Sequence, residues 1–292
     1  MLRILKRLLL ALTVTATLSA CGGAAPADSV TTSPATQPPA VLPTNAAGEQ
    51  IVARVNAQEI TLPQLQRMEA QLGGSTTEIR ALALQTLIEQ TVIRQAAAAQ
   101  NIAITDAELD AELQAYIERA GGADAWQTWL TSNNYSEADF RETLRDNLIT
   151  QRMRDSLTAD LNADVPQVHA RHILVGTEQE ALDVLARLQN GDDFAALAAV
   201  LSRDVTTRTS GGDLGWFAAD ELLEPLLAEQ AFDLQPGEIV GPVATSLGFH
   251  IIQVIERGDR PLTEDRRAFV AQVRFENWLS QLLATAAIEH YL

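Results

Sequence analysis

The stretch SGGDLGWF at residues 210–217 constrains the fold of this chain more than any other. It places three glycines within five residues, around Asp213 and Leu214, and two aromatic residues follow at once. Glycine takes positive φ angles and lets backbone approach backbone closely, so the pattern predicts a tight turn leading into a short buried strand. Such a turn needs partners elsewhere in the chain.

The residues before this region carry the pattern of a hairpin followed by helices. Residues 51–55 and 58–60 predict two short strands around a turn at Asn56, a residue that tolerates positive φ. Apolar residues then recur with a helical period to about residue 161, and TDAE at residues 105–108 predicts a capping box. This part is expected to be mainly helical.

The middle of the chain changes to an alternation of strands and helices. QVHARHILV at residues 167–175 alternates as a strand does, with His172 on the face that carries Ala170. Two helices, the glycine stretch, a helix at residues 221–232 and two short strands up to residue 256 are expected to follow. The middle therefore predicts a compact α+β unit, inserted between two helical pieces that pack on each other.

The helical signal returns after this unit. Its apolar stripe includes Phe275, Trp278 and Leu282, and AAIEHYL at the end of the sequence predicts a strand that extends the first hairpin. The expected divisions are a signal peptide at residues 1–20, a disordered tether at 21–49, a helical domain at 50–162, the α+β unit at 166–258, and a final helix with its strand at 262–292.

The first residues have the composition of an export signal. A basic start is followed by a mainly apolar stretch of eleven residues, which is shorter than a bilayer-spanning helix. LSAC at residues 18–21 resembles the bacterial lipobox, which implies that the single cysteine, Cys21, is diacylated and that the protein is a membrane-anchored extracytoplasmic lipoprotein. Residues 22–49 are rich in Pro, Ala, Thr and Ser, which predicts a tether.

The acidic charge of the chain disfavours binding to polyanions. With a formal net charge of −17, its surface repels nucleic acid and anionic lipid headgroups alike. The acyl chains rather than electrostatic attraction are expected to hold the protein at the membrane.

Five blocks in the middle of the chain carry a resemblance. In order they are ARHILV, DDFAALAAVLSRD, SGGDLGWF, LLEPLLAEQAF and PGEIVGPVATSLGFHII. Together they resemble the parvulin-type peptidyl-prolyl isomerases over residues 168–256, and residues 51–161 resemble more loosely the N-terminal segment of SurA/PrsA-type extracytoplasmic foldases. The resemblance implies a four-stranded antiparallel sheet wrapped by helices, joined to a chaperone module built from the N-terminal segment and the C-terminal helix.

Two histidines lie in apolar strands, where an imidazole is costly unless a partner satisfies it. The resemblance implies that these residues, His172 and His250, form the paired histidines beneath the active site, that Thr245 bonds one of them, and that Asp204 completes the site. His169 and His172 are three residues apart on a strand, so they are expected on opposite faces and not as metal ligands.

The resemblance also implies an apolar pocket for the proline ring. Its expected lining is Leu214, Phe217, Leu222, Leu223, Leu226 and Leu247. Leu222 and Leu226 stand where Met and Phe are common in the family, so the pocket stays apolar while its depth differs. Rotation about a prolyl bond has a barrier of about 20 kcal/mol and needs no nucleophile, metal or organic cofactor.

Three functions fit these residues. The first is a lipid-anchored isomerase and chaperone that acts on unfolded or partly folded exported polypeptides containing proline. The second is a holdase whose parvulin domain has lost turnover, and the third is a maturation factor dedicated to one exported partner. The acidic residues that follow HILV disfavour a preference for phosphoserine before proline.

Overall fold

The structure is a computed structural model that describes residues 42–222 and 224–292. The expected signal peptide, Cys21, most of the expected tether and Leu223 lie outside these residues. Within the described ranges, no helix combines the length and apolar character needed to cross a membrane.

The last residues of the expected tether form a hydrogen-bonded turn. The side chain of Asn45 accepts hydrogen bonds from the backbone amides of Ala47 and Glu49, and Thr44 forms a β-bridge with Gln50. An asparagine that bonds to the backbone two residues further on is a common turn device. The turn leads directly into the first strand.

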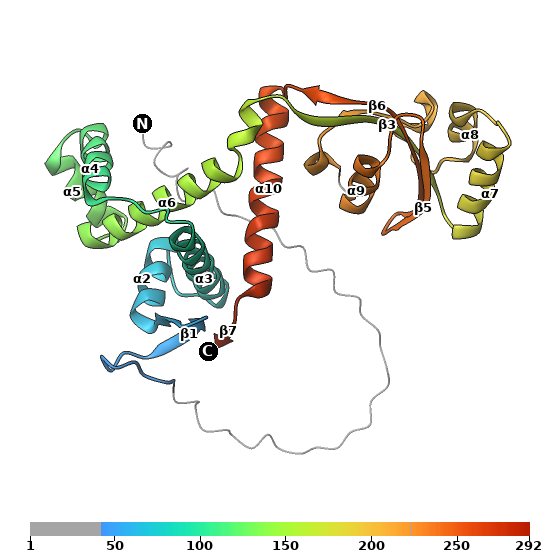
Figure 1. The fold of residues 1–292 in the computed structure, drawn as a ribbon. Coiled ribbons are helices and arrows are strands. Elements are labelled where there is room, and N and C mark those ends of the chain that lie inside the picture. Colours follow the sequence, from blue (N-terminus) through green and yellow to red (C-terminus); the bar gives the residue numbers. More distant parts are fainter. Residues whose placement is uncertain (1–41, 223) are drawn as a thin grey trace, which may run out of the picture. The chain divides into compact units, whose positions relative to one another are not determined.

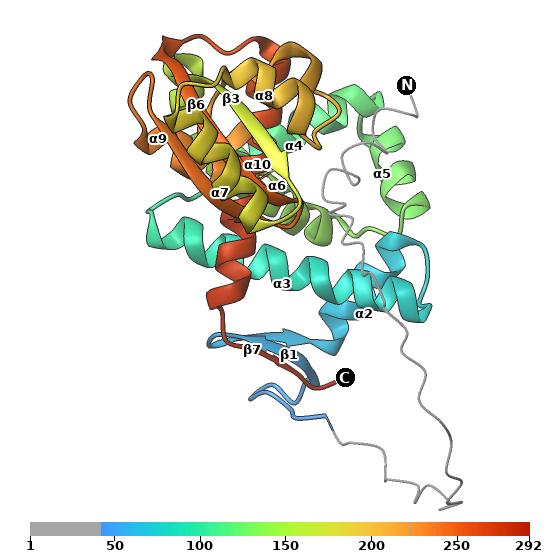
Figure 2. The ribbon, with the colours of Figure 1, turned by 90° about the vertical axis from the view of Figure 1, so that its right-hand side faces the viewer.

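The first sheet joins the two ends of the described chain. Strands β1 (Ile51–Val55) and β2 (Gln58–Thr61) form an antiparallel hairpin, and Asn56 in its turn has φ of 54°. Strand β7 (Ile288–His290) pairs antiparallel with the other edge of β1, giving the order β2-β1-β7. Figure 2 shows β7 beside β1. The predicted hairpin and its extension by the final strand are confirmed.

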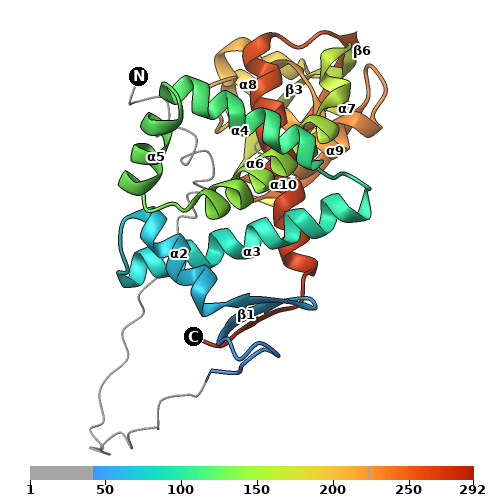
Figure 3. The same ribbon diagram turned by 90° about the vertical axis from the view of Figure 1, so that its left-hand side faces the viewer.

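Five helices follow the hairpin. They are α2 (Leu62–Leu72), α3 (Thr77–Ala99), α4 (Asp106–Ala120), α5 (Ala123–Ser132) and α6 (Glu137–Leu157), with a short 3₁₀ turn η1 (Ala159–Asn162). The predicted capping box at the start of α4 is present, because Thr105 and Glu108 satisfy each other's backbone amides. Figure 3 shows α2 and α3 beside the β1 hairpin.

The long helix α10 (Glu264–Thr285) completes the core of this helical module. Phe275 and Leu279 are 2% and 4% exposed and pack with buried side chains of β1, α3 and α6, including Val52, Ile88 and Met153. The prediction that the C-terminal helix packs back on the N-terminal segment is confirmed. A second apolar cluster lies between α4, α5 and α6, where Trp126 is a core residue at 1% exposure.

The inserted α+β unit contains a four-stranded antiparallel sheet in the order β4-β3-β6-β5. The strands are β3 (Val165–Val175), β4 (Asp213–Phe217), β5 (Ile239–Thr245) and β6 (Gly248–Arg260). Helices α7 (Glu178–Gln189) and α8 (Phe194–Leu201) cover one face, and α9 (Pro225–Asp233) covers the other (Figure 1). Two short 3₁₀ turns, η2 (Arg208–Ser210) and η3 (Ala219–Glu221), flank β4.

Two details of this unit differ from the sequence prediction. The helix expected at residues 221–232 begins only at Pro225, because proline lacks the amide hydrogen that an interior helix position needs and is favoured in the first turn. Strand β6 is not short but has 13 residues, since it stays paired with all of β3 and reaches Arg260.

Candidate active site

The central strands β3 and β6 bring the two expected histidines together. His172 is opposite Ile252 and His250 is opposite Leu174, so both imidazoles project from the same face of the sheet. Their side chains are buried, and Nδ1 of His172 lies 3.2 Å from Nδ1 of His250. The two rings lie nearly parallel, with centroids 5.3 Å apart.

The loop after α8 adds a carboxylate to the pair. Oδ2 of Asp204 lies 2.8 Å from Nε2 of His172. The loop is tied to β3, because Arg203 donates its backbone amide to the carbonyl of Leu174 at 2.7 Å and the Ser202 hydroxyl accepts the amide of Leu174. These bonds hold the carboxylate at the edge of the buried imidazole.

A hydroxyl closes the other end of the network. Oγ1 of Thr245, at the end of β5, lies 2.9 Å from Nε2 of His250. The same oxygen accepts the backbone amide of Leu247 in the turn to β6 at 3.1 Å. The hydroxyl is therefore oriented by the turn that joins the two strands.

The chemistry of the groups fixes the direction of the hydrogen bonds. A carboxylate only accepts, so Asp204 requires the proton of neutral His172 to be on Nε2. His172 Nδ1 then accepts from Nδ1–H of His250, whose Nε2 accepts from the Thr245 hydroxyl. The hydrogen bonds run one way from Thr245 to Asp204, and each group fixes the tautomer of the next.

The surroundings keep the carboxyl ionised and one histidine neutral. Burial opposes ionisation of Asp204, but hydrogen bonds from Thr207, His172 and the Thr206 amide outweigh it and hold the pKa of Asp204 well below its usual range. Burial of the imidazole is the largest cause that lowers the pKa of His250, to about 4. At neutral pH Asp204 is therefore ionised and His250 is neutral.

The glycine turn contacts the backbone of His172, a member of this network. The carbonyl of Gly212 accepts the backbone amide of His172 at 2.9 Å, and Gly212 has φ of 82°. A Cβ atom at this position would lie 2.1 Å from the carbonyl oxygen of His172. Only glycine lets β4 approach β3 this closely, which explains the turn that SGGDLGWF encodes.

Thr207 is a member of the network that the sequence analysis missed. Its hydroxyl lies 2.5 Å from Oδ2 of Asp204 and 3.2 Å from Nε2 of His172. Its carbonyl accepts the amide of Gly212 at 2.9 Å, so the residue joins the network to the glycine turn. Asp204 accepts the backbone amide of Thr206 within its own loop. A threonine three residues after such an aspartate was the sequence signal that could have indicated this contact.

The expected pocket residues differ in their burial. Phe217 is buried, and Leu214 and Leu222 pack against the same apolar cluster on the face of the sheet that α9 covers. Leu226 and Leu247 are instead 45% and 61% exposed. The pocket expected from the sequence thus has three residues in one cluster and two at the surface.

The other histidine of β3 points away from the site. His169 lies 2.8 Å from Oδ1 of Asp213 on β4 and is partly exposed, whereas His172 is buried, as expected from their spacing. Among residues 42–222 and 224–292, no group of three or more His, Cys, Asp or Glu side chains is arranged to hold a metal ion.

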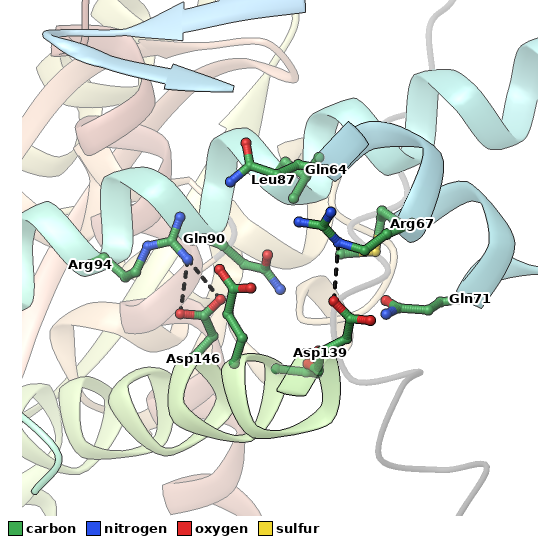
Figure 4. Close-up of a pocket in the computed structure, with 11 residues that line it drawn as sticks. Gln64, Arg67, Gln71, Leu87, Gln90, Arg94, Asp139 and Asp146 are labelled. Carbon is green, nitrogen blue, oxygen red and sulfur yellow. Dashed lines mark hydrogen bonds and ion pairs between the residues drawn. The ribbon is translucent and has the colours of Figure 1, made fainter. Parts of the chain in front are cut away.

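A polar pocket lies outside the α+β unit, between α2, α3 and α6 (Figure 4). Arg94 makes two hydrogen bonds to the buried Asp146, at 2.8 and 3.0 Å, and Arg67 lies 3.1 Å from Asp139. Both guanidinium groups are therefore engaged with α6. These ion pairs hold α2 and α3 against that helix.

The fold and site define a class. Residues 172–256 match the family model of the PPIC-type PPIASE domain, and residues 40–154 match that of the SurA-like N-terminal domain. The chain thus contains a parvulin-type peptidyl-prolyl cis-trans isomerase domain and a SurA-like N-terminal domain, and the resemblance seen in the sequence is confirmed.

Proteins similar to this chain include PrsA foldases. The chain is 27% identical over 258 residues to the foldase protein PrsA 1 of Listeria monocytogenes, covering 84% of this chain and 82% of that protein. It is 32% identical to the foldase protein PrsA of Geobacillus kaustophilus, over 60% of this chain and 61% of that protein. A crystal structure of the peptidylprolyl isomerase PrsA from Bacillus anthracis is 27% identical, with a TM-score of 0.44, over 69% of this chain and 94% of that one.

Proposed function

We propose that this protein is a lipid-anchored extracytoplasmic foldase that catalyses X-Pro isomerisation in exported polypeptides. The observation that carries the catalytic part is the one-way hydrogen-bond network of Thr245, His250, His172 and Asp204 beside an apolar cluster. The isomerase domain and the foldase relatives support the activity and the kind of client.

The catalytic proposal assigns a role to each part of the site. Leu214, Phe217 and Leu222 hold the proline ring, with Leu223, Leu226 and Leu247 as further contacts of the client chain. The network of His172, Asp204, His250 and Thr245 sets the field around the twisted prolyl bond. Since the fixed groups need no reorganisation as the amide loses resonance, the barrier of about 20 kcal/mol falls without a covalent step.

The location of the protein is the second part of the proposal. Residues 1–20 direct export, Cys21 carries the acyl chains, and the residues after it link the anchor to the folded part. Two acyl chains suffice for stable anchoring. The domain divisions at residues 50–162, 166–258 and 262–292 belong to the same proposal and assign the helical module the role of holding extended client segments.

A protease-coupled isomerisation assay on prolyl tetrapeptides tests the catalytic proposal. The wild type should accelerate cis-trans conversion, and Leu222→Ala should raise KM more than it lowers kcat, because it removes apolar contact with the proline ring. A wild type that is inactive on every prolyl peptide, yet suppresses client aggregation, would support the holdase instead.

A further inference from the structure

Helix α10 belongs to the helical module by its packing, yet its first half also contacts the isomerase domain. Phe275 and Leu279 lie in the core with β1, α3 and α6. About three turns earlier in the helix, Arg266 binds groups at the end of the isomerase sheet. One of these groups, Glu221, lies in η3 after β4 and directly precedes Leu222 of the expected proline pocket.

Arg266 joins three parts of the isomerase domain. Its Nε and Nη2 donate to the two carboxylate oxygens of Glu221 at 2.7 and 2.6 Å. Nη2 also donates to the side-chain oxygen of Gln167 on β3 at 2.8 Å and to the carbonyl of Trp216 on β4 at 3.2 Å. One guanidinium thus fixes β3, β4 and η3 relative to one another.

Glu221 transmits this fixation to the pocket segment. Its side chain is 11% exposed, and Oε2 also accepts the backbone amide of Ala218 at 2.7 Å, which closes the η3 turn. Leu222 is the next residue, and it packs on the apolar cluster that contains Phe217. The carboxylate that shapes the turn is therefore the one that Arg266 holds.

A second arginine of α10 binds the same turn and ties it to the helical module. Arg274 lies 3.0 Å from Oδ2 of Asp220, and its Nη1 donates to both oxygens of Asp160 at 2.7 and 2.9 Å and to the carbonyl of Leu157 at 3.2 Å. Between the two arginines lies a small buried cluster that includes Ala218 and Val270. The turn before Leu222 is therefore held from α10 by charge and by apolar contact.

We propose that Arg266 is a positioning residue for the proline pocket, supplied by a helix outside the isomerase sheet and acting through Glu221. This inference rests on the proposed function, because it assigns the pocket to the segment around Leu222. Lysine cannot replace the arginine, since an ammonium group has three donors and lacks the planar fork that binds both carboxylate oxygens of Glu221 while also reaching Gln167 and Trp216.

The test compares Arg266→Ala and Arg266→Lys with the wild type in two assays: isomerisation of a prolyl tetrapeptide, and calorimetric binding of a non-cleavable prolyl peptide. Arg266→Ala should weaken peptide binding and raise KM by about fivefold, which is about 1 kcal/mol, with kcat changed less than about twofold. Arg266→Lys should recover only part of the affinity. Arg119→Ala, which removes an exposed arginine paired within α4, is the matched control and should match the wild type.

Unchanged peptide affinity and KM in Arg266→Ala would overturn the inference, as would full recovery by lysine, because a general charge effect does not need the planar fork. If Arg266→Ala fails to fold by circular dichroism, Arg266→Lys and Glu221→Gln decide in its place, and wild-type affinity in both would equally refute it. An inactive wild type would count against the isomerase function, while the ratio of peptide affinities would still decide the role of Arg266.

Discussion

Replacing Asp204 by asparagine tests whether the carboxylate fixes the direction of the hydrogen bonds in the histidine network. Asparagine has nearly the same shape as aspartate but carries no charge, and its amide donates as well as accepts. The requirement that His172 keep its proton on Nε2 is then lost. The hydrogen bonds to His250 and Thr245 can reverse, and the field at the prolyl bond changes.

The size of the effect follows from the contacts that are weakened. Oδ2 of Asp204 receives His172 at 2.8 Å and Thr207 at 2.5 Å, and Oδ1 receives the Thr206 amide at 3.0 Å. A hydrogen bond to a charged group is worth about 1.5–3 kcal/mol, so loss of the charge should lower kcat about 10- to 150-fold if its effect is felt in the transition state. Peptide affinity should change little, because the apolar cluster remains.

The protease-coupled assay gives kcat, and calorimetry gives the affinity for a prolyl peptide. Asp183→Asn, an exposed aspartate of α7 that bonds only to Gln179 among the described hydrogen bonds, is the control and should behave as the wild type. Full activity of Asp204→Asn on a prolyl tetrapeptide would refute the reasoning and reduce Asp204 to the cap of its own loop.

Three further predictions follow. The pKa of His250 is lowered to about 4 in the folded protein, so between pH 6.5 and pH 4 this histidine is protonated in the unfolded chain but not in the folded one. The free energy of unfolding therefore decreases as the pH is lowered through this range. In urea unfolding, the unfolding free energy of the wild type should decrease by about 2 kcal/mol between pH 6.5 and pH 5, and that of His250→Gln should not. An equal pH dependence of stability in the two proteins would contradict this prediction. Phe275→Ala should cost the helical module about 3–5 kcal/mol in chemical denaturation, and a loss below about 1 kcal/mol would rule out its core role. Cys21→Ser should move the protein from the membrane to the soluble fraction, and continued membrane binding would exclude the lipid anchor.

The sequence predicted the features that depend on local patterns. The capping box at Thr105, the turn at Asn56 and the stripe containing Phe275 each show a residue type repeated or paired at short range. The pairing of β7 with β1 was also predicted, since each strand needed a neighbour to satisfy its backbone. The two histidines were found because a buried imidazole needs a partner.

Long-range polar contacts could not be predicted in this way. Arg266 and Gln167 are 99 residues apart, and nothing in either stretch of sequence marks one as the partner of the other. The position of Thr207 three residues after Asp204 suggests a local contact with the aspartate, but it does not reveal the contact with His172 on β3. The exposure of Leu247 likewise depends on how the β5–β6 turn projects from the sheet, which a leucine in a sequence does not reveal.

The pairing of β1 with β7 affects the order in which the protein folds on the proposed export route. A polypeptide that crosses a membrane from its N-terminus delivers β1, α3 and α6 early, but their partners in α10 and β7 arrive last. The isomerase sheet closes sooner, because β3 to β6 follow one another in the chain. Until α10 emerges, the helical module exposes apolar side chains that this helix buries in the folded protein. On the proposed export route, this protein is itself incompletely folded during that interval, in the same state as the polypeptides on which it is proposed to act.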